Sequence, residues 1–465
     1  MMAYFERWRI PPDFQSPDSD ERVGGVVRRY VPDLLMEVDN SVSAEVAEYV
    51  GDVTAQAAAF GAVTRARPLS TLYATLLKSE SISSSLIEGY RTPPGEVLMA
   101  EFDPGSTSAV AMTVWRNVQA LNESLSTLDG EWTADAVHGV HHKLLPHQPY
   151  GCREQQVRIG GRSLFRAAFV PPSADVVPAY LDDLVRYANG GGETTLTKAA
   201  VLHAQFETIH PYGDGNGRTG RALVHALFKR AGLVEGAVLP VSTVLKARQD
   251  EYVEALGKYR YDGVAGVGGA VRASRREAVD WFVRSFTDAV NDSVTLAGRV
   301  RDDVDAVEAS WAEKTRHIRS DSVAHAILAA LPDAPIVTAE SVSRRFGVTA
   351  AAAARAIGRL ADAGVLAKAA GKHKKSSAYL APDILALMVD AERRAASPQF
   401  DTVLAAPVLH TPPPSGPLDL GCGAWMPKSE TPCVLSRGHA GRHKGRRVVG
   451  ESVGADEGRR DADVG

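Results

Sequence analysis

The sequence predicts an all-α protein whose helical core is interrupted by one β-hairpin, and three observations support this fold class. Apolar residues recur at intervals of three and four, the spacing of one helix face, through most of the first 300 residues. Two short β-prone pieces flank Gly160-Gly161 within residues 155–170, which predicts a hairpin there. The composition, 45% hydrophobic and 23% charged, is that of an ordinary globular protein. The expected helices cover residues 43–88, 107–128, 134–144, 174–188, 196–209, 219–231, 245–257 and 274–300.

The chain length and cysteine content narrow the class of protein. At 465 residues the chain has room for two or three domains, given roughly 100–200 residues per domain. The net charge of −4 neither favours nor excludes nucleic acid as a partner. The three cysteines, Cys152, Cys422 and Cys433, are too few for a disulfide framework. Because no apolar leader or membrane-spanning run is found either, we expect a cytoplasmic protein with no membrane partner.

A short segment between two helical patterns has the composition of a phosphate-binding loop. Residues 210–221 read HPYGDGNGRTGR and lead directly into a helix. The first turn of that helix would expose unpaired N–H groups and the positive end of the helix dipole, which together bind phosphate. Gly213, Gly215 and Gly217 would let the backbone approach an anion closely. The segment therefore predicts an anion site at a helix N-terminus.

Four side chains of the same segment have the chemistry that a nucleotide reaction needs. The imidazole of His210, with an ordinary pKa of about 6.5, can take a proton from a hydroxyl. Asp214 offers the hard oxygen ligand that Mg²⁺ requires. Arg218 and Arg221 are three residues apart, so they share a helix face and can clamp outer phosphates.

These residues resemble the signature of the Fic family, H-x-F-x-(D/E)-G-N-G-R-x-x-R, with Tyr212 at the phenylalanine position. The resemblance implies a Fic-type helical core and an enzyme that transfers AMP from ATP to a Ser, Thr or Tyr hydroxyl of a target protein. It implies that His210 is the general base and that Asp214 holds Mg²⁺. The intact G-N-G-R argues against the kinase-like Doc branch of the family. The implied nucleotide-binding residues are Gly215, Asn216 and Gly217 at the α-phosphate and Arg218 and Arg221 at the outer phosphates.

A second match lies upstream, at the end of the helix expected at about residues 72–89. Ser84-x-x-x-Glu88-Gly89 resembles the inhibitory motif of the family, (S/T)-x-x-x-E-(G/N). The resemblance implies that Glu88 forms a salt bridge with Arg221 and so competes with a phosphate for one guanidinium. In some relatives this glutamate instead orients a water that removes AMP. Alternatively, Glu88 is a solvated glutamate at the end of a helix and has no inhibitory role.

Two further features of the expected core each allow two interpretations. The hairpin resembles the family's flap, whose edge pairs with a target segment; the expected edge residues are Val157, Ile159, Gly160 and Gly161. A purely structural hairpin is the alternative. Tyr252 is expected either to reach the nucleotide base or to pack in the core.

The predicted domain order follows from these matches. Residues 1–106 form an N-terminal region with an irregular start at 1–40, residues 107–300 the catalytic core, and residues 301–319 a helical linker. Residues 320–392 resemble a winged helix-turn-helix, with Arg355 and Arg359 on the recognition helix. The wing is basic, with Lys368, Lys372, His373, Lys374 and Lys375. DNA binding and protein docking both remain open for this module.

The last segment, 393–465, is rich in Pro, Gly and Arg and is expected to be disordered. Within 422–443 it carries four residues that suit a tetrahedral Zn²⁺, in a spacing that departs from common fingers. The four are Cys422, Cys433, His439 and His443. An alternative is that these are isolated residues of a basic tail.

The leading functional interpretation is an autoinhibited protein adenylyltransferase that uses ATP and Mg²⁺. Its partners would be ATP and a target protein, either another protein or a copy of the chain itself, and a homodimer is compatible with the family. Three alternatives remain open. The chain could be a DNA-binding regulator with a nucleotide-sensing core, a Fic transferase with another nucleotide donor, or an enzyme that removes AMP by means of Glu88.

Overall fold

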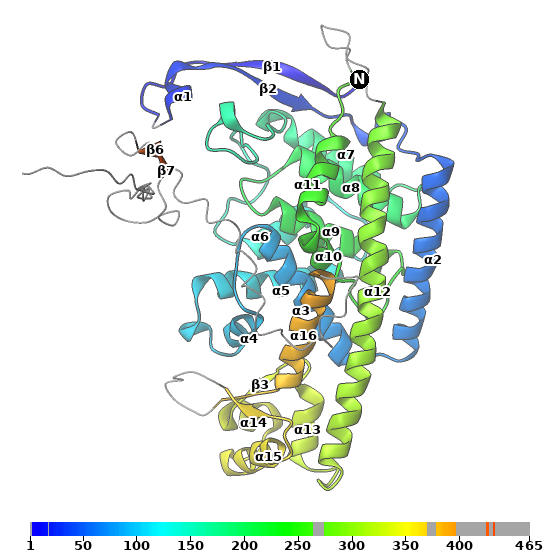
Figure 1. Ribbon diagram of the computed structural model, residues 1–465, viewed down its shortest axis with the longest axis vertical. Helices are drawn as coiled ribbons and strands as arrows, with labels where there is room; N and C mark the ends of the chain where they lie inside the picture. The colour runs from blue at the N-terminus through cyan, green and yellow to red at the C-terminus, as the bar shows by residue number, and fades with distance from the viewer. Residues whose placement is uncertain are drawn as a thin grey trace, which may run out of the picture. The chain divides into compact units, whose positions relative to one another are not determined.

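The fold is mostly helical, as the sequence predicts, and Figure 1 shows the computed structural model. The structure describes residues 2–16, 18–263, 274–369 and 378–396, together with two short strands at 425–426 and 431–432. The helices of the first part are α2 (Ala44–Ala66), α3 (Ser70–Ile87), α4 (Pro94–Phe102), α5 (Ala109–Thr127), α6 (Ala134–Leu144), α7 (Val177–Asn189), α8 (Thr195–Ile209), α9 (Asn216–Arg230), α10 (Val241–Ala247), α11 (Gln249–Tyr259) and α12 (Arg275–Thr315).

Three helix boundaries differ from the prediction. The pattern over 43–88 is divided into α2 and α3 at Arg67, which precedes Pro68 and therefore leaves the helical region of backbone space. Likewise 245–257 is divided into α10 and α11 at Arg248. Helix α12 continues to Thr315, so the predicted linker at 301–319 is largely the second half of one long helix. Its capping box at Ser274 and Glu277 determines where it begins.

The N-terminal segment was predicted to be irregular, but in the structure it forms a β-hairpin. Strands β1 (Tyr4–Ile10) and β2 (Gly25–Val31) pair antiparallel, and the short helix α1 (Ser19–Val23) lies between them. Arginines and aromatic residues share both strands, so the hydrophobic alternation that marks a strand is weak in the sequence. The hairpin is held in place by a small satellite core of Ala3, Tyr30, Phe169, Tyr261 and Ala278.

The predicted flap is less regular than a hairpin. A single β-bridge joins Ile159 to Phe169, and the turn between them contains a 3-10 helix at Leu164–Arg166. Gly161 has φ +66°, and a Cβ there would overlap the backbone of Arg166, so the turn requires glycine. The N–H of Tyr30 donates to the carbonyl of Val170 at 3.0 Å, which joins the flap to the N-terminal hairpin.

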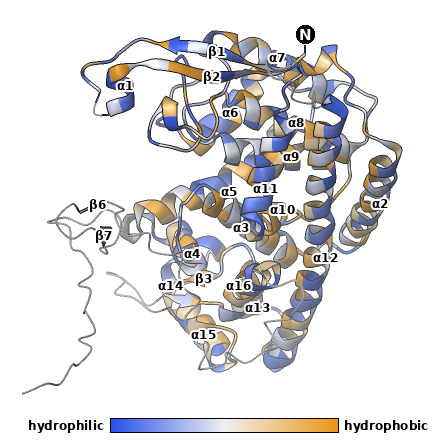
Figure 2. Cartoon of the chain, turned by 45° about the horizontal axis from the view of Figure 1, so that its top comes forward, coloured by the Kyte–Doolittle hydropathy of each residue, from blue (hydrophilic) through white to orange (hydrophobic). Residues whose placement is uncertain are grey.

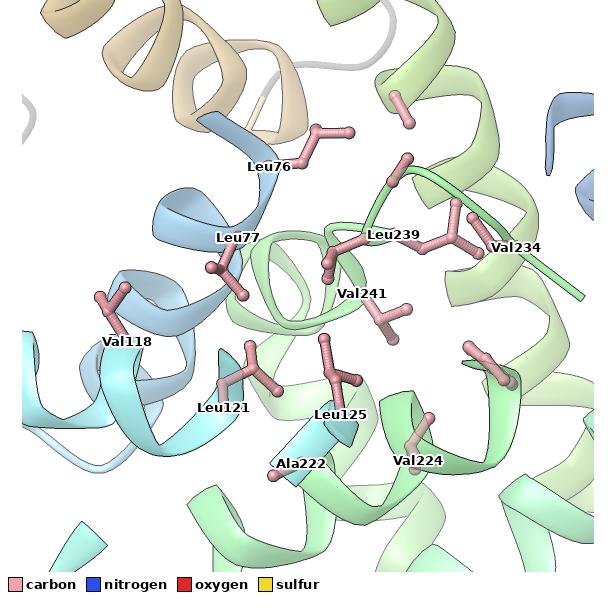
Figure 3. Packing of buried hydrophobic residues seen from close by; sticks show 14 of the residues in the cluster. Leu76, Leu77, Val118, Leu121, Leu125, Ala222, Val224, Val234, Leu239 and Val241 are labelled. Atoms are coloured by element: carbon pink, nitrogen blue, oxygen red, sulfur yellow. The ribbon is translucent and has the colours of Figure 1, made fainter. Parts of the chain in front are cut away.

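The main hydrophobic core lies between α3, α5, α9 and the segment that leads into α10. Figure 3 shows side chains from these elements converging on one interior region. The labelled residues are Leu76, Leu77, Val118, Leu121, Leu125, Ala222, Val224, Val234, Leu239 and Val241. In Figure 2, α2 and α12 each carry hydrophilic and hydrophobic residues along their length, as expected for helices with one buried face. This packing fixes α3 against α9, which contains the 216–221 part of the motif.

Residues 323–380 form three helices and a small sheet. The elements are α13 (Val323–Ala330), β3 (Ile336–Val337), α14 (Ala339–Phe346), α15 (Ala350–Asp362), β4 (Ala367–Lys368) and β5 (Tyr379–Leu380), with strand order β3-β5-β4. Arg355 and Arg359 are exposed on α15, and Lys368 is exposed on β4. The other basic wing residues, Lys372, His373, Lys374 and Lys375, lie outside the described residues. Identification of this module as a winged helix remains a prediction.

This module is tied to the helix that precedes Glu88. Helix α16 (Pro382–Ala396) returns from the module and packs on α3, α4, α10 and α12, which Figure 1 shows as the orange helix beside α3. The ammonium of Lys78 on α3 donates to the carbonyl of Asp333 at 3.1 Å and pairs with Glu101 of α4 at 3.4 Å. Residues 320–392 therefore make extensive contacts with the helices of the catalytic region.

The C-terminal residues 404–465 form a separate unit. Its described part is an antiparallel pair of strands, β6 (Trp425–Met426) and β7 (Thr431–Pro432). All four predicted zinc ligands, Cys422, Cys433, His439 and His443, lie outside the described residues. In the described part of the chain, no helix has the length and apolar character required to cross a bilayer.

Candidate active site at the start of helix α9

The motif segment forms the loop between α8 and α9, as predicted. Helix α8 ends at Ile209, and its C-cap residue His210 has φ +52°, the single positive value among the described non-glycine residues. Helix α9 begins at Asn216, preceded by Gly215 with φ +80°, and no side chain caps its first turn. The backbone N–H groups of that turn are therefore available for an anion. A non-glycine residue in the left-handed region costs on the order of 1–3 kcal/mol and persists where its surroundings impose it.

Arg153 imposes the conformation of this loop, a role that sequence reasoning missed. Its buried guanidinium donates to the carbonyls of His210 at 2.9 Å, Gln155 at 2.9 Å and Pro172 at 2.6 Å. Its own N–H donates to the carbonyl of Pro211 at 2.8 Å. Nothing in the sequence near Arg153 indicates these contacts, because the carbonyls come from segments that only the fold brings together.

Tyr212 and Asn216 make the loop rigid. The amide side chain of Asn216 accepts from the N–H of Tyr212 and donates to its carbonyl, both at 2.9 Å. The Tyr212 ring stacks on His141 with centroids 3.7 Å apart. Burial lowers the pKa of His141 to about 4, so His141 is neutral and its Nε2–H donates to the carbonyl of Asp214 at 2.9 Å. The Asn216 side chain is thus occupied within the loop, and an anion would meet the backbone N–H groups.

The extra hydroxyl of Tyr212 has a partner in His138, whose Nδ1 lies 2.9 Å away. We expect Tyr212→Phe to lower the free energy of unfolding by about 1 kcal/mol, the net value of such a hydrogen bond. Because the aromatic ring is retained, nucleotide binding should change less than twofold. Urea unfolding and an ATP-induced shift in melting temperature measure the two effects, and a large loss of ATP binding would contradict this assignment.

Arg218 is fully buried, yet no hydrogen bond to its guanidinium is formed among the described residues. Its nearest carboxylate oxygen is Asp214 Oδ1 at 3.6 Å, and the Tyr90 ring covers it at 4.6 Å from the ring centroid. A buried cation without hydrogen-bonded partners is costly. The site is therefore built for an anion that satisfies Arg218. Tyr90, directly after the upstream motif, was not identified from the sequence.

Arg221 is already satisfied, by the upstream motif. Its Nε donates to Ser84 Oγ at 2.9 Å, and its Nη2 donates to the Ser84 carbonyl and to Glu88 Oε1, both at 2.8 Å. Burial alone would lower the pKa of Arg221, but Glu88, Tyr252 and Glu207 together outweigh burial and raise this pKa. A Cβ on Gly217 would overlap Glu88 Oε1, so this glycine permits the contact. The predicted pairing of Ser84 and Glu88 with Arg221 is present in the structure.

His210, directly after α8, has 18% of its side chain exposed. Burial, followed by the positive charge of Arg260, lowers the pKa of His210 to about 3. The imidazole is therefore neutral near pH 7 and free to accept a proton. Its Nδ1 is 3.3 Å from the carbonyl of Glu207, which favours the tautomer with a proton on Nδ1 and a lone pair on Nε2.

The remaining predicted site residues have more ordinary surroundings. The Tyr252 hydroxyl is buried and bonded to His203 Nε2 at 2.7 Å, which favours packing over contact with a base. In the flap, the N–H and carbonyl of Ile159 are both bonded to the Ala168–Phe169 segment. In the described structure the backbone groups of Arg158 and Gly160 form no hydrogen bonds. The free edge is therefore at 158 and 160, with Val157 and Gly161 at its ends.

Taken together, a neutral histidine, an uncapped helix start and two buried arginines have the chemistry of a phosphate-binding site. Residues 131–228 match the family model described as Fic/DOC family. Protein adenylyltransferase fic-1 of Caenorhabditis elegans is 32% identical over 145 residues, which cover 29% of this chain and 27% of that protein. A probable protein adenylyltransferase of Aquifex aeolicus is 29% identical over 119 residues, 22% of this chain and 37% of that protein.

Among solved structures, a Fic family protein from Desulfovibrio desulfuricans G20 matches with a TM-score of 0.44 and 20% identity. That match covers 73% of this chain and 97% of the other. The chain spans about a quarter to a third of the length of the two curated relatives above.

Proposed function

We propose that this protein transfers AMP from ATP to a hydroxyl of a target protein and that Glu88 inhibits the transfer. The observation that supports it most is the buried Arg218 without a hydrogen bond, beside a neutral His210 at an uncapped helix start. A site that only packed would pair its buried guanidinium. The relatives named adenylyltransferases share this segment, which supports the same chemistry here.

The reaction follows from the positions of the groups. Nε2 of His210 takes the proton of the target hydroxyl, and the oxygen attacks the α-phosphorus of ATP. A new oxygen–phosphorus bond forms as the bond from the α-phosphorus to the bridging oxygen breaks, and pyrophosphate leaves. The N–H groups at the start of α9 would stabilise the charge on the α-phosphate, and Arg218 and Arg221 would bind the outer phosphates.

The residues around Asp214 fit a magnesium ion that arrives with the nucleotide. The Asp214 side chain is 47% exposed beside the start of α9. The described residues include no group of three or more histidines, cysteines or acidic residues that could hold a metal alone. Mg²⁺ is commonly bound by one or two carboxylates plus substrate phosphates, so Asp214 suits it. When bound, the ion would neutralise phosphate charge.

Inhibition follows from competition for one guanidinium. Glu88 occupies the Nη2 of Arg221, where an outer phosphate would bind. Tyr90, two residues on, covers Arg218, and its hydroxyl is 3.5 Å from Asp214 Oδ2. The segment after α3 thus contacts both arginines and the proposed magnesium ligand. ATP would bind productively only after this segment moves.

Transfer of label from α-³²P-ATP in the presence of Mg²⁺ and host lysate tests the function. The protein or a lysate protein should become labelled once Glu88 is removed, and γ-labelled ATP should transfer nothing. If label is transferred from α-labelled UTP or GTP but not from ATP, only the assignment of ATP as the nucleotide donor would be wrong. Absence of transfer from every nucleotide, with DNA binding by the intact chain, would support the regulator instead.

Arg218→Met is expected to stabilise the free protein and weaken nucleotide use. The change removes a buried charge that has no hydrogen bond and only a 3.6 Å ion pair with the half-exposed Asp214, so the melting temperature without ATP should stay level or rise. In a Glu88→Gly background kcat/KM should fall about 100-fold, since truncating one partner of a buried charge pair costs about 2–5 kcal/mol. Thermal melting with and without ATP measures stability and binding, and the initial rate of label transfer measures kcat/KM. An ATP-induced stabilisation equal to that of the parent would contradict the role of Arg218.

A further inference from the structure

Glu207 is a buried carboxyl group that the reaction above does not use. It lies on α8, one turn before His210, with 8% of its side chain exposed. Its Oε2 is 3.9 Å from Nδ1 of His210, and its Oε1 has no hydrogen bond in the described structure. Buried polar atoms are nearly always bonded, so an unpartnered one next to the base requires an explanation.

Charged and titratable groups from several segments surround Glu207. They comprise Glu88 after α3, Arg221 of α9, Tyr252 of α11, Arg260 after α11 and His203 on α8 itself. The cations nearest to His210 are Arg260 and Arg153. Among the described residues, Glu207 is the one acidic side chain within ion-pairing distance of His210.

We infer that Glu207 and His210 accept the target's proton as a pair, with Glu207 the positioning residue that makes His210 an effective base. The inference rests on the proposed function. The proton of the target hydroxyl moves to Nε2 of His210, while the Nδ1–H stays bonded to the Glu207 carbonyl at 3.3 Å and the Glu207 carboxylate, 3.9 Å from Nδ1, balances the new positive charge. One proton enters the pair and no electrons are exchanged.

The physical reason is that His210 alone would be a poor base. Burial and Arg260 lower the pKa of His210 to about 3, and a general base works best with a pKa near the operating pH. Burial and the charge of Glu88 raise the pKa of Glu207 to about 7. Interacting groups titrate as a pair, so the two together bind one proton near neutral pH. The carboxylate also offsets the positive charge that the imidazole gains between Arg153 and Arg260.

Glu88 has two effects. It competes with a phosphate for Arg221, and its negative charge also influences the protonation of Glu207 and His210. Its carboxylate is the second cause, after burial, of the raised pKa of Glu207, while Arg221 and Arg260 lower it. While Glu88 is bonded to Arg221, Glu207 and His210 therefore tend to hold one proton between them at neutral pH. In that state they cannot accept the proton of a target hydroxyl. Removal of Glu88 should move this protonation to lower pH.

A nuclear magnetic resonance titration tests the pair without any activity. Histidine Cε1 would be labelled with carbon-13, and the His210 signal identified by its absence in His210→Ala. In the protein with Glu88 intact we expect this signal to shift with a midpoint near pH 7, and we expect Glu207→Gln to abolish that step. A midpoint that is unchanged in Glu207→Gln would overturn the inference.

The rate test uses a Glu88→Gly background. Adding Glu207→Gln should lower kcat at least about tenfold, since a positioned base contributes about 10²–10⁴-fold, with KM for ATP within twofold. The acid limb of the pH–rate profile should move to lower pH, which a purely structural residue would not cause. Equal kcat and an unmoved limb would contradict the inference.

The matched control is Glu80→Gln in the same background. Glu80 is also a buried carboxyl group facing a histidine, with Oε1 at 2.7 Å from His225 Nε2, but it lies outside the proposed site. We expect it to lower the melting temperature without moving the pH limb. A pH limb that moves equally in both variants would count against a specific role for Glu207. If no variant transfers nucleotide while the titration behaves as expected, the proposed function fails and the proton pair stands.

Discussion

Glu88→Gly should raise the rate of AMP transfer about 10- to 100-fold. The variant loses a hydrogen bond to a charged group, which contributes about 1.5–3 kcal/mol and stabilises only the inhibited state in which Glu88 is bonded to Arg221. The bond is that between Arg221 Nη2 and Glu88 Oε1 at 2.8 Å, with 30% of the Glu88 side chain exposed. Once it is absent, a phosphate can bind Arg221. The initial rate of label transfer from α-³²P-ATP measures the effect.

Two control variants separate charge from backbone effects. Glu88→Gln keeps the side-chain length and removes the charge, so it should reproduce most of the activation. Glu123→Gln removes a half-exposed glutamate that pairs with Lys143 on the surface, and it should leave the rate unchanged. A Glu88→Gly protein no more active than the parent would refute inhibition by Glu88.

His210→Ala in the Glu88→Gly background should lower the transfer rate about 10²- to 10⁴-fold, the usual contribution of a positioned general base. ATP binding should persist, because the phosphates are assigned to α9 and its arginines rather than to the imidazole. Label transfer measures the rate, and the ATP-induced rise in melting temperature measures binding. Transfer that survives the substitution would remove His210 from the mechanism.

The backbone at position 210 calls for a second variant. His210 has φ +52°, a region that alanine adopts at a cost of roughly 1–2 kcal/mol and that asparagine tolerates better. His210→Asn should therefore melt at a higher temperature than His210→Ala while being equally inactive. Agreement between the two would show that lost activity reflects the missing base and not a distorted loop.

The inhibitory contact is connected to the rest of the chain through α3. The end of this helix positions Ser84 and Glu88 against Arg221, while Lys78 near its middle bonds to the Asp333 carbonyl of the C-terminal module. Helix α16 packs on α3 as well. Because the module and the inhibitory residues share one helix, a change in the module could reach Glu88 through contacts already present.

Much of the site was predictable because its chemistry is local in the sequence. His210, Asp214, Arg218 and Arg221 lie within twelve residues, and the helical periodicity on either side places them in a loop before a helix start. The pairing of Glu88 with Arg221, 133 residues apart, was predicted only through resemblance to a known motif. Helices with strong periodicity, such as 134–144, were also predicted correctly.

Other features depended on contacts between distant segments. Arg153 holds carbonyls at 155, 172 and 210, Tyr90 covers Arg218, and Glu207 lies between Glu88, Arg221 and His210. A local pattern states which groups are present, but burial and neighbouring charge, which determine pKa and hydrogen bonding, arise only when the helices pack. The N-terminal hairpin was missed for the same reason, since Tyr30 is recognisable as a core residue only beside Phe169 and Tyr261. The sequence by itself determined the helices and the reactive groups, and the tertiary structure decided which of those groups are paired, buried and charged.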